Sequence, residues 1–158
     1  MNIRSTDPQD AFSDRSGANE RPPARVLVLF DATANGAAAL REAAACCGGD
    51  THLTVVTLAP QSVQPRCCSR GATVEPLNCA IREAAEGELA EARKILGDTS
   101  RGATFKSLVG MRDPPLAEWA AQQTFDVIVL PARRLSFGGH PFARRLRRAT
   151  VAELRLVG

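Results

Sequence analysis

The sequence predicts an α/β protein built on a single parallel sheet of five strands, with helices on both faces of the sheet. Two observations lead to this prediction. Short apolar segments alternate with longer segments of helical periodicity along residues 25–157. The first apolar segment, RVLVLF at 25–30, is continuous rather than alternating, which is typical of a strand that is buried on both faces.

Five strands and four helices are expected in strict alternation. The strands are the apolar runs at 25–30, 52–58, 103–109, 126–131 and 152–157. The helices are the segments at 34–47, 77–96 and 141–149, with a shorter one after Asp113. We expect Asp113 to cap this shorter helix and Pro114 and Pro115 to begin it, because proline is favoured in the first helical turn.

A polar tail precedes the domain. Residues 1–24 contain proline and glycine and few large apolar side chains, so we expect a disordered tail and a folded domain spanning 25–158. The 158-residue chain is long enough for one domain and short for two. No stretch resembles a membrane span or the apolar region of a secretory signal. A cytoplasmic protein without membrane contact is therefore expected.

Positive charge is concentrated near the carboxyl end. The net charge of +3 is too small to predict nucleic-acid binding by itself, and no specific nucleic acid is expected. Between positions 133 and 155, a single acid, Glu153, accompanies seven arginines: Arg133, Arg134, Arg144, Arg145, Arg147, Arg148 and Arg155. Such a patch either binds phosphate or acidic partners or is a solvated helix face. In the last helix we expect Phe142, Leu146 and Ala149 to face the core.

The cysteines do not form a recognisable site. They are Cys46, Cys47, Cys67, Cys68 and Cys79. An odd number without a secretory signal argues against a disulfide framework, and neither a CxxC motif nor a nearby histidine suggests a metal site. We expect free thiols and no metal. A redox or metal response through Cys67, Cys68 and Cys79 stays open as a further hypothesis.

Several segments, taken in order, resemble the universal stress protein family. They are RVLVLFDATANGAAALREAA at 25–44, HLTVVTL at 52–58, the long helix after a variable loop, LVG at 108–110 before a proline-led helix, and FDVIVLPARR at 125–134. The resemblance implies a flavodoxin-like sheet with strand order 3-2-1-4-5. In that order, ligands bind outside the carboxyl ends of the first and fourth strands, where the strand order reverses.

The resemblance also implies a nucleotide site at those two strand ends. The positions concerned are Asp31, Ala32 and Thr33 after the first strand, and Arg133 and Arg134 after the fourth. Asp31 matches the acid that contacts the adenine side of the nucleotide in family members that bind ATP. A turn or helix-capping function is the alternative for this residue.

The phosphate loop of those members has the pattern G-x2-G-x9-G-[ST], and this chain departs from it. Pro131 and Arg134 occupy the first two glycine positions, and the closing Gly-[ST] falls at His140-Pro141, several residues too early. Pro131 has no N–H to donate to a phosphate. We therefore expect a degenerate loop that does not hold ATP tightly. The alternative is that Arg133 and Arg134 replace the missing donors.

The expected function is binding or regulation in the stress response, with no cofactor. No catalytic motif is present, so an enzyme is not expected. The alternative is an ATP or AMP sensor, or a slow ATPase, with a phosphate site rebuilt from Arg133 and Arg134. The alanine- and arginine-rich composition suggests a bacterium of high GC content. The sequence does not identify the protein partners.

The resemblance further implies a homodimer formed through the last strand. In the segment VAELRLV, Ala152, Leu154 and Leu156 alternate with Glu153 and Arg155. We expect Glu153, Leu154 and Arg155 at the interface, because antiparallel pairing about Leu154 places position 153 of one chain opposite position 155 of the other. The alternative is that the two charges keep this edge strand free.

Overall fold

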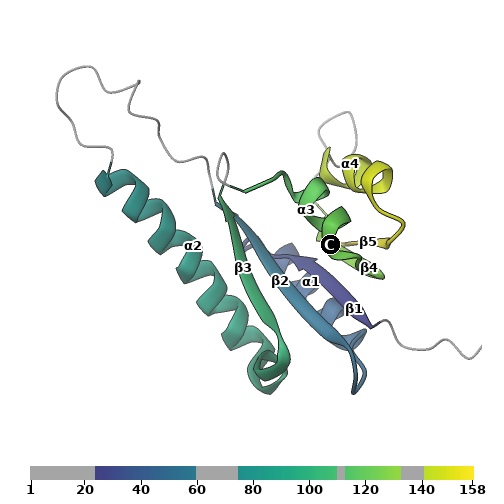
Figure 1. Ribbon diagram of the computed structural model, residues 1–158. Coiled ribbons are helices and arrows are strands. Elements are labelled where there is room, and N and C mark those ends of the chain that lie inside the picture. Colours follow the sequence, from purple (N-terminus) through teal and green to yellow (C-terminus); the bar gives the residue numbers. More distant parts are fainter. Residues whose placement is uncertain (1–23, 60–74, 110–112, 133–140) are drawn as a thin grey trace, which may run out of the picture.

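Five parallel strands form the sheet at the centre of the protein (Figure 1). The computed structural model describes residues 24–59, 75–109, 113–132 and 141–158. The strands are β1 (Arg25–Leu29), β2 (His52–Ala59), β3 (Thr104–Val109), β4 (Val127–Pro131) and β5 (Glu153–Val157). Their order across the sheet is β3-β2-β1-β4-β5, and every pair is parallel. The predicted fold class and strand order are confirmed.

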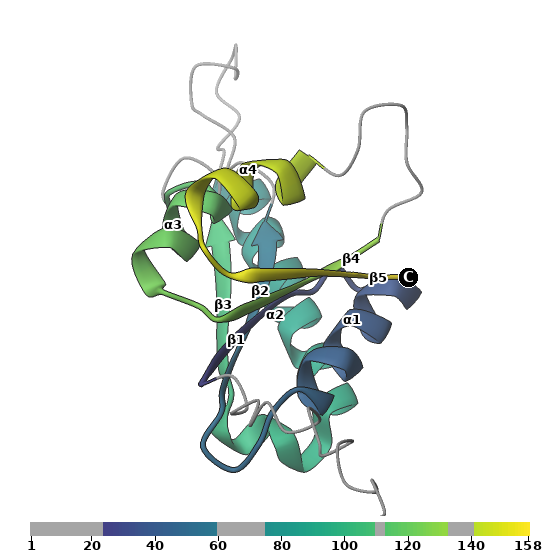
Figure 2. The same cartoon turned by 90° about the vertical axis from the view of Figure 1, so that its right-hand side faces the viewer.

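Helices cover both faces of the sheet (Figure 2). One face carries α1 (Ala34–Ala45) and α2 (Glu75–Leu96), and the other carries α3 (Leu116–Gln123) and α4 (Pro141–Ala149). A short 3-10 helix, η2 (Gly97–Gly102), follows α2. None of the helices in the described ranges is long and apolar enough to cross a membrane.

The central strand β1 is buried on both faces, because it lies between β2 and β4 and has helices on each side. Its side chains alternate between two apolar clusters. Val26 and Val28 belong to the cluster beneath α1 and α2, and Leu27 and Leu29 belong to the cluster beneath α3 and α4. All four side chains are at most 2% exposed. The continuous apolar run therefore marks a strand covered on both faces, as predicted.

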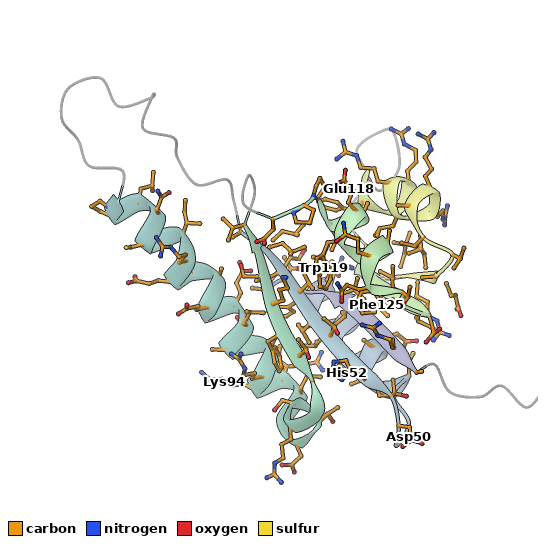
Figure 3. The ribbon with its side chains drawn as sticks, in the orientation of Figure 1. Asp50, His52, Lys94, Glu118, Trp119 and Phe125 are labelled. Carbon is orange, nitrogen blue, oxygen red and sulfur yellow. The ribbon has the colours of Figure 1, made fainter. Side chains whose placement is uncertain are left out.

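Aromatic rings pack beneath α3. The rings of Trp119 on α3 and Phe125, just before β4, lie with their centroids 5.7 Å apart (Figure 3). The guanidinium carbon of Arg25 lies 5.2 Å from the Phe125 ring centroid, and the Lys106 ammonium lies 5.2 Å from that of Trp119. These cation–π contacts connect β1 and β3 to the α3 side of the sheet.

The predicted start of α3 is wrong. The helix begins at Leu116 with Pro115 at its N-cap position. Asp113 instead closes the turn after β3, because its backbone N–H donates to the Val109 carbonyl at 3.0 Å and its Oδ2 accepts from the Val109 N–H at 2.9 Å. The side chain is thus occupied by the preceding strand and is not available to cap the helix.

The inward face of α4 also differs from the prediction. Ala143 and Leu146 are buried, Phe142 is partly buried, and Ala149 is exposed. Two side chains three positions apart on an α-helix are separated by about 300°, which is about 60° short of a full turn. Ala149 therefore turns away from the face that Ala143 and Leu146 define.

Candidate functional site

The carboxyl ends of β1 and β4 lie side by side at the point where the strand order reverses. β1 pairs with β4 from Val26 opposite Val127 to Val28 opposite Val129, and it pairs with β2 along its other edge. From β1 the chain passes through α1 to β2 on one side, and it later returns to β4 on the other side. In open parallel sheets, ligands bind outside the carboxyl ends of the strands at such a reversal.

Asp31, Ala32 and Thr33 form a tight turn between β1 and α1. The backbone of Ala32 has a φ of 54°, in the left-handed region. Oδ1 of Asp31 accepts hydrogen bonds from the Thr33 hydroxyl at 2.6 Å and from the Thr33 backbone N–H at 3.3 Å. Thr33 is the N-cap of α1, because its Oγ1 accepts from the Gly36 N–H at 3.0 Å. Asp31 therefore orients the capping hydroxyl.

This geometry corresponds to the turn and capping function that was the alternative for Asp31. Asp31 is only partly buried. Its predicted contact with a nucleotide stays a prediction. The turn also depends on Gly36 in the first turn of α1, where any Cβ would overlap the Asp31 carboxylate. Glycine permits this close approach because it lacks a Cβ.

Beyond β4, Ala132 uses both of its backbone polar groups within the chain. Its N–H donates to the Val157 carbonyl at 2.6 Å, and its carbonyl accepts from Nδ2 of Asn35 at 2.5 Å. Pro131, at the end of β4, has no N–H. The two positions that lead into the predicted phosphate loop therefore offer no free amide donor.

Sequence patterns do not identify Asn35 and Gly36 as parts of this site. Asn35 connects the first turn of α1 to the end of β4, 97 residues later, and nothing local distinguishes it from any other asparagine at a helix start. Gly36 carries only a general signal, because glycine is disfavoured inside helices, and Gly87 inside α2 carries the same signal without any close contact. Asn35 becomes recognisable only once the end of β4 is known to lie beside the first turn of α1.

The remaining predicted site residues are placed only in part. Arg133 and Arg134 lie outside the described residues, as do His140, Cys67 and Cys68. The structure thus joins the end of β1 to the end of β4 but does not place the two arginines relative to Asp31. Among the residues that are described, no group of three or more His, Cys, Asp or Glu side chains is arranged to hold a metal ion.

The described cysteines are free thiols in different environments. Cys46 and Cys47 lie partly buried at the end of α1, and Cys79 is exposed on α2. The Cys47 thiol donates to the Ala43 carbonyl at 3.2 Å, and burial, together with the neighbouring Cys46, raises the pKa of Cys47. A thiol that stays protonated reacts slowly with oxidants.

Several solved structures with this architecture are universal stress proteins. A family member from Burkholderia pseudomallei matches with a TM-score of 0.60 and 20% identity, over 84% of this chain and 94% of that chain. The fold is that of the universal stress proteins. The resemblance stated from the sequence is thus confirmed at the level of the fold. No protein-family model matches the chain, and no curated protein matches it either.

Two further universal stress proteins of this fold were solved with nucleotides. One, in complex with cAMP, matches with a TM-score of 0.61 and 16% identity over 87% of this chain and 99% of that chain. The other, from Archaeoglobus fulgidus in complex with dAMP, matches with a TM-score of 0.56 and 19% identity over 85% of this chain and 97% of that chain. Nucleotide binding is thereby known for those two proteins.

The universal stress fold leaves β5 at one edge of the sheet, with the predicted interface residues on it. Leu154 packs towards α3 and α4, whereas Arg155 points to α1. Nε of Arg155 lies 2.8 Å from Oε1 of Glu153, and NH1 lies 3.6 Å from Oε1 of Glu42 and 2.9 Å from Sγ of Cys46. The bond from Arg155 lowers the pKa of Glu153, and the Glu153 carboxylate raises the pKa of Arg155.

Proposed function

We propose that this protein is a universal stress protein that acts by binding and regulation and does not hold ATP tightly. One observation carries the proposal. The two positions that lead from β4 into the phosphate loop have no free amide, since Pro131 has no N–H and the Ala132 N–H donates to Val157. Phosphate loops of this fold depend on backbone amides that approach the phosphates. Without them, the binding energy for a triphosphate is reduced.

A nucleotide sensor is the second candidate function. Two observations support it: the Asp31 carboxylate lies at the reversal of the strand order, and relatives of the same fold were solved with cAMP and dAMP. In this candidate, Asp31 contacts the nucleoside and Arg133 and Arg134 bind the phosphates in place of the amides.

Isothermal titration of ATP, AMP and cAMP into nucleotide-stripped full chain separates the two candidates. The proposal predicts dissociation constants weaker than about 1 mM, corresponding to less than about 4 kcal/mol of binding free energy. Micromolar binding that is lost in Asp31→Ala and in Arg133→Ala/Arg134→Ala would establish the sensor instead. Asp50→Ala is the matched control, because Asp50 is an exposed acid in the connection between α1 and β2 (Figure 3).

We further propose a homodimer through β5. Three features support it: β5 is an edge strand, its Leu156 side chain is 47% exposed, and its Glu153 and Arg155 carry opposite charges. Antiparallel pairing about Leu154 would place each Glu153 opposite Arg155 of the partner subunit. The salt bridge within each chain would then become part of a network of four alternating charges.

A further inference from the structure

The exposed face of α4 carries four arginines and no acid. Arg144, Arg145, Arg147 and Arg148 are all exposed, whereas Ala143 and Leu146 on the opposite face of the helix are buried. Side chains three and four positions apart are neighbours on a helix, so Arg144 lies beside Arg147 and Arg148, and Arg145 lies beside Arg148. The four guanidinium groups form one continuous basic surface, which we call the α4 arginine face.

Nothing in the described part of the chain neutralises this face. None of its four guanidinium groups forms an ion pair or a hydrogen bond with a described residue, including Glu118, the one acid of the adjacent α3. Like charges at these spacings destabilise a helix. The helix dipole favours Arg147 and Arg148 in the last turn, but it gives no reason for Arg144 and Arg145.

We propose that the α4 arginine face binds the phosphate backbone of duplex nucleic acid without sequence preference. Guanidinium groups bind phosphate oxygens bidentately, and all four basic residues of this face are arginine rather than lysine. The nine residues of α4 extend about 13.5 Å. Over that length a DNA duplex carries about eight backbone charges. A duplex lying along α4 therefore offers more phosphates than this face has guanidinium groups.

Other anionic partners fit this face less well. An interfacial helix binds a membrane through its apolar side, but Ala143 and Leu146 of α4 lie in the core. Hot spots of protein interfaces combine arginine with tryptophan and tyrosine, and single-stranded nucleic acid stacks its bases on exposed aromatic rings. Across the described ranges, the exposed large apolar side chains are Leu77, Val151 and Leu156, none of them aromatic. A duplex backbone requires only the charged donors that α4 presents.

Fluorescence anisotropy of a labelled mixed-sequence DNA duplex, titrated with the full chain, tests this proposal. If four phosphates are neutralised, the affinity falls about fifty-fold between about 50 and 150 mM salt. The Arg144→Gln/Arg148→Gln variant keeps two arginines, and its affinity should fall only about seven-fold over the same interval. The matched control, Arg41→Gln/Lys94→Gln, removes the same charge from exposed positions on α1 and α2 and should keep the full salt dependence.

Three outcomes would overturn the proposal. The first is no change in anisotropy at about 50 mM salt, where nonspecific binding is strong. The second is a control variant that loses as much affinity as the Arg144/Arg148 pair, because net charge alone would then explain the binding. The third is co-sedimentation with phosphatidylserine vesicles that requires the α4 arginines while the duplex stays unbound. Arg145→Gln/Arg147→Gln provides an independent variant, and circular dichroism verifies that each variant is folded.

Discussion

The carboxylate of Asp31 lies directly against the α-carbon of Gly36, so the turn after β1 and the first turn of α1 pack without room for a side chain. We expect Gly36→Ala to destabilise the protein. Overpacking costs about 1–3 kcal/mol, which exceeds the roughly 1 kcal/mol or less that alanine returns through its better helix propensity. Urea unfolding of the variant measures the difference.

The control for this prediction is Gly87→Ala in α2, where a Cβ would meet no atom within 4 Å. That change should stabilise the protein by up to about 1 kcal/mol. Removing the carboxylate in Asp31→Ala/Gly36→Ala should recover part of the stability lost in Gly36→Ala. Equal stability of the two single glycine variants would show that Asp31 does not restrict position 36.

A second prediction concerns the hydrogen bond between Thr57 on β2 and Glu88 on α2. The Thr57 hydroxyl, which is 1% exposed, donates to the carboxylate of Glu88, which is only partly buried. Glu88→Ala leaves the buried hydroxyl without its acceptor and should cost about 1–3 kcal/mol. Thr57→Val should cost less, because it keeps the shape of the side chain and Glu88 can still reach water.

Urea unfolding of the two single variants and of Thr57→Val/Glu88→Ala measures the coupling between these residues. The double variant should be less destabilised than the sum of the singles, because it no longer buries an unpaired hydroxyl. Strictly additive values would mean that the hydrogen bond contributes nothing to folding.

A third prediction tests the dimer through β5. Glu153→Arg places arginines opposite each other across the proposed two-fold axis and should weaken self-association. An equimolar mixture of Glu153→Arg and Arg155→Glu should associate again, because each mixed pair regains opposite charges. Sedimentation velocity of the wild type, of each variant and of the mixture provides the measurement. A monomeric wild type at all concentrations would rule out this interface.

A fourth prediction follows from the lowered pKa of Glu153. Because the pKa is lower in the folded state than in the unfolded state, the salt bridge to Arg155 stabilises the protein at pH values above the ordinary glutamate pKa of 4.5. That contribution is lost as the pH falls through the lowered pKa. NMR titration of the carboxyl carbon should give a midpoint below 4.5 in the wild type. In Arg155→Gln the midpoint should rise towards the ordinary value, and an unchanged midpoint would assign the shift to another cause.

The strands could be predicted from the sequence because their signal is local. Continuous apolar runs such as RVLVLF need only their own composition to be recognised as doubly covered strands. Element ends were less predictable, since they depend on competing hydrogen bonds. Asp113 precedes a proline-led helix, and aspartate is a favoured N-cap residue. Its carboxylate nevertheless accepts a hydrogen bond from the Val109 N–H in β3. Sequence alone does not decide whether such a carboxylate accepts from the N–H groups of the following helix or from those of the preceding strand.

The site shows the same division between local and distant information. The turn function of Asp31 could be inferred from its position after a strand, because its partner Thr33 is two residues away. The link from Asn35 to Ala132 and the contact of Arg155 with Glu42 each join segments that are far apart in the chain. Such pairs become visible only when the sheet places β1, β4 and β5 side by side.

β1 and β4 are neighbours in the sheet but far apart in the sequence. This separation also determines when the protein can fold during its synthesis. The backbone N–H of Arg25 donates to the carboxylate of Asp126, 101 positions later. β4 pairs with the edge of β1 that β2 leaves unpaired. Until the ribosome has released β4, the nascent β1 has an open edge and an uncovered apolar side, which is a hazard for aggregation. Translation products that stop before β4 would therefore remain unfolded and become substrates for chaperones and proteases.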